Sequence, residues 1–100
     1  SIDPAVVLYL MKKEGLSVDD MDRILNKESG VLGISGVSSD MREVTAAANS
    51  GNERARLALD MYFYRIKKYI GAYAAAMNGV DVIVYTGGIG ENDAYIRADA

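Results

Sequence analysis

The sequence contains no cysteine and no histidine among its 100 residues, and it has a single proline. Without cysteine there are no disulfides, no thiolate zinc sites and no cysteine nucleophiles, a composition that fits a reducing cytoplasm. Without histidine the chain lacks the commonest general base near neutral pH and the commonest metal ligand. Catalysis would have to use Asp, Glu, Lys, Arg, Ser or Tyr, so we expect the chain to hold only part of a catalytic site.

Strong positive charge and long apolar runs are also missing. Eleven Lys and Arg residues and fourteen Asp and Glu residues give a net charge of −3. Duplex nucleic-acid binders gain affinity from neutralised phosphates, so a mildly acidic chain without a basic run is a poor candidate for that class. No apolar stretch reaches the ~20 residues that span a bilayer, and residues 1–5 lack the features of a signal peptide. We therefore expect a cytoplasmic protein without nucleic-acid or membrane partners.

Capping residues predict two helices in the first quarter of the chain. Asp3 followed by Pro4 is a strong helix start, and Gly15 is the expected stop, which places the first helix over residues 4–14. Ser17, followed by acidic residues that suit the positive end of the helix dipole, predicts a second helix that ends near Lys27.

Two further helices are predicted in the middle of the chain. Ser38 or Ser39 starts a short helix through about Ala48, and Asn52 caps a long one over residues 53–77. Charged residues are confined to the N-terminal part of the long helix, so we expect it to pass from a surface into a core. Its apolar stripe recurs at the helical period and consists of Leu59, Phe63, Ile66, Ile70, Tyr73 and Met77.

The remaining segments are predicted to be non-helical. Residues 29–39 alternate glycine and serine with large apolar residues, which indicates a loop that includes at most a short extended piece. Residues 80–86 form a β-branched and aromatic run typical of a strand buried on both faces. Because such a strand needs neighbours, the simplest interpretation is that these residues are a piece of a larger α/β protein.

The strongest candidate site is the glycine-rich turn that follows the predicted strand. Glycines let the backbone approach a ligand closely, and the start of a helix offers free N–H groups to phosphate or ribose oxygens. Gly90 is followed by acidic and amide residues rather than Lys-Ser/Thr, which excludes a Walker A loop, and the glycine spacing does not complete a dinucleotide fingerprint. The alternative is that the glycines serve turn geometry alone.

Residues 35–42 form the second candidate, because serines, Asp40 and Arg42 gather at a helix start. The alternative interpretation makes the serines and Asp40 capping residues and Arg42 a solvated surface charge. The tyrosines of the long helix are interpreted as packing residues, and the basic residues at positions 65, 67 and 68 as a solvated face.

Several segments, spread over essentially the whole chain, match one known family in their order. They are Asp3-Pro4, Leu25-Asn26-Lys27-Glu28-Ser29-Gly30, Gly33-Ile34-Ser35-Gly36, Ser38-Ser39-Asp40-Met41-Arg42, Gly51-Asn52-Glu53-Arg54-Ala55, Tyr64-Arg65-Ile66-Lys67-Lys68-Tyr69-Ile70-Gly71-Ala72-Tyr73 and Tyr85-Thr86-Gly87-Gly88-Ile89-Gly90-Glu91-Asn92. Together they resemble the acetate kinase family.

The resemblance implies a reversible phosphoryl transfer from ATP to acetate, giving ADP and acetyl phosphate, with Mg²⁺ and in a homodimer. It also implies the α/β, ribonuclease H-like fold shared with sugar kinases, actin and heat-shock chaperone ATPases. Residues 1–100 would be part of the C-terminal nucleotide-binding domain of a larger two-domain kinase, mostly helical here with one buried strand. The sequence also resembles propionate and butyrate kinases. An alternative from a different class of protein is a non-enzymatic helical interaction module.

By the resemblance, two segments of this chain contact the nucleotide. The adenosine would be contacted by Asp40, Met41 and Arg42, and the ribose and phosphates by Gly88, Ile89, Gly90, Glu91 and Asn92. Met41 stands where other members can carry an aromatic residue, but a thioether also packs against an adenine. The family's catalytic and metal-linked residues lie outside this stretch, so none is assigned here and the isolated chain is predicted to be inactive.

Overall fold

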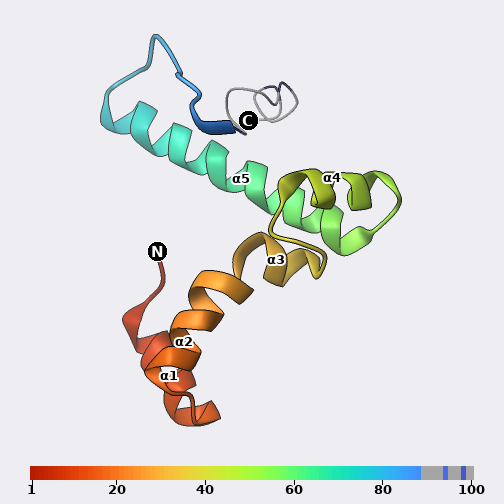
Figure 1. The fold of residues 1–100 in the computed structure, drawn as a ribbon. Coiled ribbons are helices and arrows are strands. Elements are labelled where there is room, and N and C mark those ends of the chain that lie inside the picture. The colour runs from red at the N-terminus through yellow and green to blue at the C-terminus, as the bar shows by residue number, and fades with distance from the viewer. Residues whose placement is uncertain (89–93, 95–97, 99–100) are drawn as a thin grey trace.

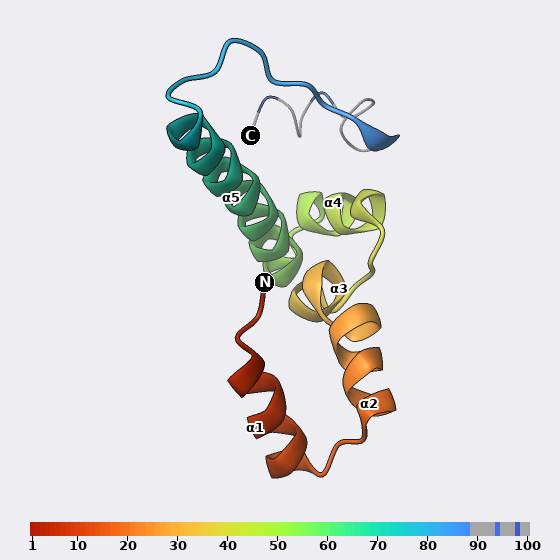
Figure 2. The same cartoon turned by 90° about the vertical axis from the view of Figure 1, so that its left-hand side faces the viewer.

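A computed structural model describes residues 1–88, 94 and 98. Its elements, in chain order, are α1 (Pro4–Glu14), α2 (Val18–Arg23), the π-helix η1 (Ile24–Glu28), α3 (Gly30–Ser35), α4 (Met41–Asn49) and α5 (Glu53–Ala76). The radius of gyration is 16.4 Å, against about 13 Å for a compact domain of this length. Figures 1 and 2 show the reason for this extended form: α1 and α2 stand apart from the long helix α5 and join the rest of the chain through α3. None of the described helices is long and apolar enough to cross a membrane.

The first helix has the predicted bounds because its caps are strong. The Ala5 N–H donates to Asp3 Oδ1 over 2.9 Å, Pro4 occupies the first helical position, and Gly15 ends the helix with φ +65°. A left-handed residue at this position is best supplied by glycine, which has no Cβ to oppose a positive φ. The sequence prediction for residues 4–14 is confirmed.

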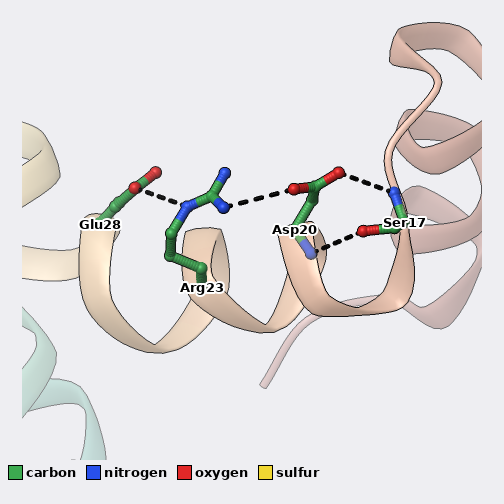
Figure 3. A network of polar contacts seen from close by, with 4 residues as sticks. All are labelled: Ser17, Asp20, Arg23 and Glu28. Atoms are coloured by element: carbon green, nitrogen blue, oxygen red, sulfur yellow. Dashed lines mark hydrogen bonds and ion pairs between the residues drawn. The ribbon is translucent and has the colours of Figure 1, made fainter.

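The second helix begins with a capping box. Ser17 Oγ accepts from the Asp20 N–H and Asp20 Oδ2 accepts from the Ser17 N–H, both over 3.0 Å. Figure 3 shows Arg23 continuing this network by donating to Asp20 and to Glu28. The bonds from Ser17, and to a smaller extent Arg23, lower the pKa of the Asp20 carboxyl. The helical segment ends at Glu28, close to the predicted Lys27, but its last turn is the π-helix η1 rather than α-helix.

Residues 29–39 are not a loop throughout, and the prediction is wrong for α3. The glycines at positions 30 and 36 lie at the two ends of this short helix, both with positive φ, rather than interrupting it. The Gly36 N–H closes the helix by donating to the Leu32 carbonyl over 2.8 Å. Val31 and Ile34 pack against the core, so tertiary contacts stabilise a segment whose composition is typical of a loop.

A small core holds α3 and α4 against the N-terminal half of α5. Leu59 and Val44 are its two large side chains with no more than 1% exposure. Alanines on α4 and α5 allow the helices to approach closely. The buried apolar residues of this cluster are Met41, Val44, Ala48, Ala55, Ala58, Leu59 and Phe63.

The far end of α5 and the segment after it contradict two predictions. Residues 80–86 are not a strand, and Val82 and Val84 are 73% and 77% exposed. Tyr73 and Met77 are each 61% exposed, so within this chain α5 does not run into a core. Both results have the same cause. A strand needs a neighbouring backbone to pair with, and the described residues include no second extended segment that could pair with residues 80–86 or cover the end of α5. The predicted fold is therefore confirmed in being mostly helical, and wrong in its buried strand.

Candidate functional site

The N-terminus of α4 is built by two successive side-chain caps. The Asp40 N–H donates to Ser38 Oγ over 2.9 Å, and the Arg42 N–H donates to Asp40 Oδ1 over 2.9 Å. Asp40 is therefore the residue that caps α4, where the sequence had predicted Ser38 or Ser39. Ser38 instead holds the backbone N–H of Asp40, two residues further on. This places the Asp40 carboxylate at the positive end of the helix dipole.

Asp40 also pairs with the side chain of Arg42. The Arg42 Nη2 lies 2.7 Å from Asp40 Oδ2, and its Nε lies 3.1 Å from Oδ1. The arginine side chain is 90% exposed, so this planar, charged pair stands in solvent at the start of the helix. The guanidinium side chain, and then the backbone N–H of the same residue, lower the pKa of Asp40 to about 2.

Met41 lies between these two residues but points the opposite way. Its side chain is 7% exposed and belongs to the core with Val44 and Leu59. The three residues predicted to contact adenosine are thus contiguous, but the structure divides them: Asp40 and Arg42 face solvent, and Met41 anchors the turn beneath them. What the pair offers a ligand is one carboxylate and one exposed guanidinium.

The turn that leads into α4 is tied to α5 by Arg54. Its Nε donates to the Ile34 carbonyl over 3.0 Å, and its Nη2 donates to the Gly33 carbonyl over 3.1 Å. Gly36 packs against the same guanidinium, since a Cβ built there would lie 2.9 Å from Nη1. Arg54 therefore connects the last turn of α3 to the first turn of α5.

The sequence pattern predicted no role for Arg54 beyond a charged helix face. A signal was nevertheless present: it is the second residue of α5, where the helix dipole favours anions rather than cations. An arginine at such a position is electrostatically unfavourable unless it serves another contact. The two carbonyl groups of α3 are that contact.

The glycine-rich candidate lies mostly outside the described residues. Ile89, Gly90, Glu91 and Asn92 fall there, and only Gly88 of that set is described. Figures 1 and 2 both show the chain after α5 turning back on the side of α5 that carries α4, toward the end where α4 begins. The described residues that lead to Gly88 thus lie on the same side of the long helix as α4.

The two glycines at the start of this turn differ in backbone conformation. Gly87 has φ +74°, whereas Gly88 is exposed and a Cβ built there would meet nothing within 4 Å. Gly87 is thus explained by conformation, and Gly88 is left open toward solvent. Across the described part of the chain, no group of three or more acidic residues could hold a metal ion.

Comparison with known proteins identifies the family. The sequence profile of the Acetokinase family matches residues 1–100, and the chain belongs to that family. It is 65% identical over 97 residues to an acetate kinase from Caldicellulosiruptor bescii, covering 97% of this chain and 24% of that protein. The chain thus spans about a quarter of the length of this relative.

Solved structures give the same result. The crystal structure of Porphyromonas gingivalis acetate kinase matches with a TM-score of 0.91 and 58% identity, over 99% of this chain and 25% of that one. A propionate kinase from Francisella tularensis matches with a TM-score of 0.89 and 42% identity, over 99% of this chain and 26% of that one. The predicted family is confirmed, and the open arrangement in Figure 1 is the path of the corresponding quarter in both relatives.

Proposed function

We propose that this chain is part of an acetate kinase that transfers the γ-phosphoryl group of ATP reversibly to acetate, forming ADP and acetyl phosphate. The observation that carries the proposal is the 65% identity, over nearly the whole chain, to a protein named acetate kinase. In this proposal residues 1–100 belong to a C-terminal nucleotide-binding domain of a larger two-domain enzyme. The enzyme is cytoplasmic and works as a homodimer.

The proposed role of the α4 N-terminus is to bind the adenosine. The planar guanidinium of Arg42 can stack on a base, and its second face stays open because the side chain is 90% exposed. The Asp40 carboxylate holds that plane in place and can also accept a hydrogen bond from a hydroxyl group. Met41 contributes by burying its side chain, which fixes the backbone between the two.

The proposed role of the glycine turn is to lie under the ribose and phosphates. Gly88 offers an N–H group without a side chain to block its approach, and the described segment turns back toward the start of α4. Gly90, Glu91 and Asn92 complete this loop in the proposal. Both segments then contact one nucleotide from the same side of α5.

The chemistry of transfer requires groups that this chain does not itself present. Phosphoryl transfer depends on positioning and on charge neutralisation by cations and Mg²⁺. In this proposal residues 40–42 and 88–92 contribute to nucleotide binding, while the acceptor, the metal ion and the catalytic side chains are held by the rest of the enzyme. Acetate and ATP are therefore substrates of the whole protein.

The test is nucleotide titration of the full-length protein, with acetate, propionate and butyrate compared as acceptors. We expect saturable ATP binding and the highest kcat/KM with acetate. Higher kcat/KM with propionate would favour the second candidate, a propionate kinase, which the Francisella tularensis match supports. Absence of ATP binding would overturn both and favour a non-enzymatic helical module.

A further inference from the structure

Arg54 makes the two side-chain hydrogen bonds that join distant parts of the described chain, across 20 and 21 residues. We propose that Arg54 is a positioning residue for the nucleotide: it holds the turn between α3 and α4 so that Asp40 and Arg42 are presented in one fixed orientation. This inference rests on the function proposed above. It adds a residue that touches no substrate but sets the ATP affinity.

Arg54 satisfies carbonyl groups that the end of α3 leaves unpaired. The last carbonyls of a helix have no partner within it. The Val37 N–H, which would bond Gly33 in a continued helix, donates instead to Ser35 Oγ over 3.1 Å. The guanidinium takes over the carbonyls of Gly33 and Ile34, and charge-assisted hydrogen bonds of this kind are stronger than neutral ones.

The turn after α3 also fits closely against this guanidinium. Gly36 has φ +69°, and a Cβ there would lie 2.9 Å from Arg54 Nη1 and 3.1 Å from Cζ. Both the conformation and the contact favour glycine at this position. Gly36 and Arg54 are both exposed, but the guanidinium lies directly against the turn and bonds two of its carbonyl groups, which ties it to one arrangement of the backbone.

Hydrogen bonds further along the same turn connect it to Asp40 and Arg42 of the candidate site. Four residues beyond Gly36, the Asp40 N–H is bonded to Ser38 Oγ, and Asp40 then binds Arg42 through backbone and side chain. The turn is thus held at its start by Arg54 and at its end by the buried Met41. If the first anchor is lost, the turn must be ordered when ATP binds, and that cost reduces affinity.

The test is Arg54→Ala in the full-length enzyme. Hydrogen bonds to charged groups contribute enough that we expect the KM for ATP to rise about ten- to a hundred-fold, with little change in kcat or in the KM for acetate. Arg54→Lys should recover part of the affinity, because an ammonium group can reach one of the two carbonyls. The matched control is Arg56→Ala, which removes the same charge from the same helix. Among the described residues, Arg56 makes one long hydrogen bond, to the Asn49 side chain at 3.4 Å, and none to the turn between α3 and α4. It should leave the KM for ATP unchanged.

A second variant covers the case in which Arg54→Ala fails to fold. Gly36→Ala places a Cβ 2.9 Å from Arg54 Nη1 at a backbone position with φ +69°, so it should displace the guanidinium or the turn and raise the KM for ATP in the same selective way. The proposal is overturned if these variants bind ATP like the parent, or if kcat and both KM values change together as in a general loss of structure. Arg42→Ala distinguishes the positioning role of Arg54 from the proposed adenosine contact. If Arg42→Ala weakens ATP binding and the Arg54 and Gly36 variants do not, only the positioning role is overturned. If Arg42→Ala also leaves ATP affinity unchanged, the proposed adenosine contact fails as well.

Discussion

Arg42 folds back onto Asp40, the residue that caps its own helix, with Nη2 2.7 Å from Oδ2 and the backbone N–H 2.9 Å from Oδ1. One carboxylate therefore serves both as a helix cap and as the partner of an exposed guanidinium. Because both bonds favour the ionised carboxylate, they act in the same direction on its pKa. The start of α4 is thus an electrostatic unit of two residues.

This unit predicts a specific pH response. The pKa of Asp40 in the folded chain is about 2, below its ordinary value of 3.8, so the folded state favours the ionised form. The resulting stabilisation is complete above the ordinary pKa and is lost as the pH falls through about 2. An NMR titration of the Asp40 carboxyl and the Arg42 amide should show a midpoint near the lower value. Arg42→Ala should raise that midpoint, and Arg56→Ala should not; an unchanged midpoint in Arg42→Ala would contradict the assignment.

The core predicts different effects for two leucines that are two residues apart on α5. Leu59 is 1% exposed, so Leu59→Ala should lower the free energy of unfolding by about 2–5 kcal/mol. Leu57 is 52% exposed, and Leu57→Ala in the same chain should change it by less than about 0.5 kcal/mol. Urea unfolding of the 100-residue chain, followed by circular dichroism, measures both. Equal effects would show that the core does not form as described.

The exposed apolar segment after α5 predicts self-association of the isolated chain. Val82, Ile83 and Val84 form a contiguous exposed run, and such runs associate in water. Val84→Lys should therefore increase the monomer fraction in sedimentation experiments. The matched control is Val18→Lys, which adds the same charge at a valine of similar exposure, 74% against 77%, outside this run. A parent chain that stays monomeric would contradict the prediction.

The glycine turn predicts that Gly88→Val weakens ATP binding in the full-length enzyme. Gly88 lies outside the positive-φ set and has open space around it, so valine is tolerated in the chain itself. The added side chain would instead block the nucleotide, and losing a backbone hydrogen bond to a charged group corresponds to about a five- to hundred-fold loss of affinity. ATP affinity is measured beside the melting temperature. Parent-like affinity in a folded variant would make the turn purely structural.

The isolated chain is predicted not to form acetyl phosphate. It contains no histidine, and its described residues offer no acidic cluster for a metal ion. The measurement is acetate- and ATP-dependent production of ADP by the purified 100-residue chain, with the full-length enzyme as the positive control. Any turnover above that of an Arg42→Ala preparation of the same chain would contradict the prediction.

The fold could be predicted from the sequence where local signals determine it. Asp3, Ser17 and Asn52 cap their helices through their own side chains, and the bounds of α1 and α5 follow to within one residue. Residues 30–35 and 80–86 could not be predicted in this way. The first are helical through packing of Val31 and Ile34 on distant α5, and the second lack any backbone to pair with among the described residues.

The candidate site was predicted in part for the same reason. Asp40 and Arg42 lie together because they are neighbours at a helix start, which sequence alone indicates. The burial of Met41 and the anchoring by Arg54 depend on how α4 and α3 pack against α5. Contacts across about 20 residues leave no periodic trace in a sequence, and the signal for Arg54 was electrostatic instead: a cation in the first turn of a helix.

The π-helix η1 changes which sequence spacing brings two side chains together on one face of the helix. On an α-helix, residues five apart lie about 140° apart around the axis and do not meet. Here Arg23 Nε contacts Glu28 Oε1 over 2.9 Å, and Ser29 Oγ donates to the Ile24 carbonyl over 2.6 Å, both across five residues. The wider winding brings these partners together. A homologue shorter by one residue between Arg23 and Glu28 would keep the same ion pair on an ordinary α turn, so a one-residue gap in an alignment here would conserve the contact rather than break it.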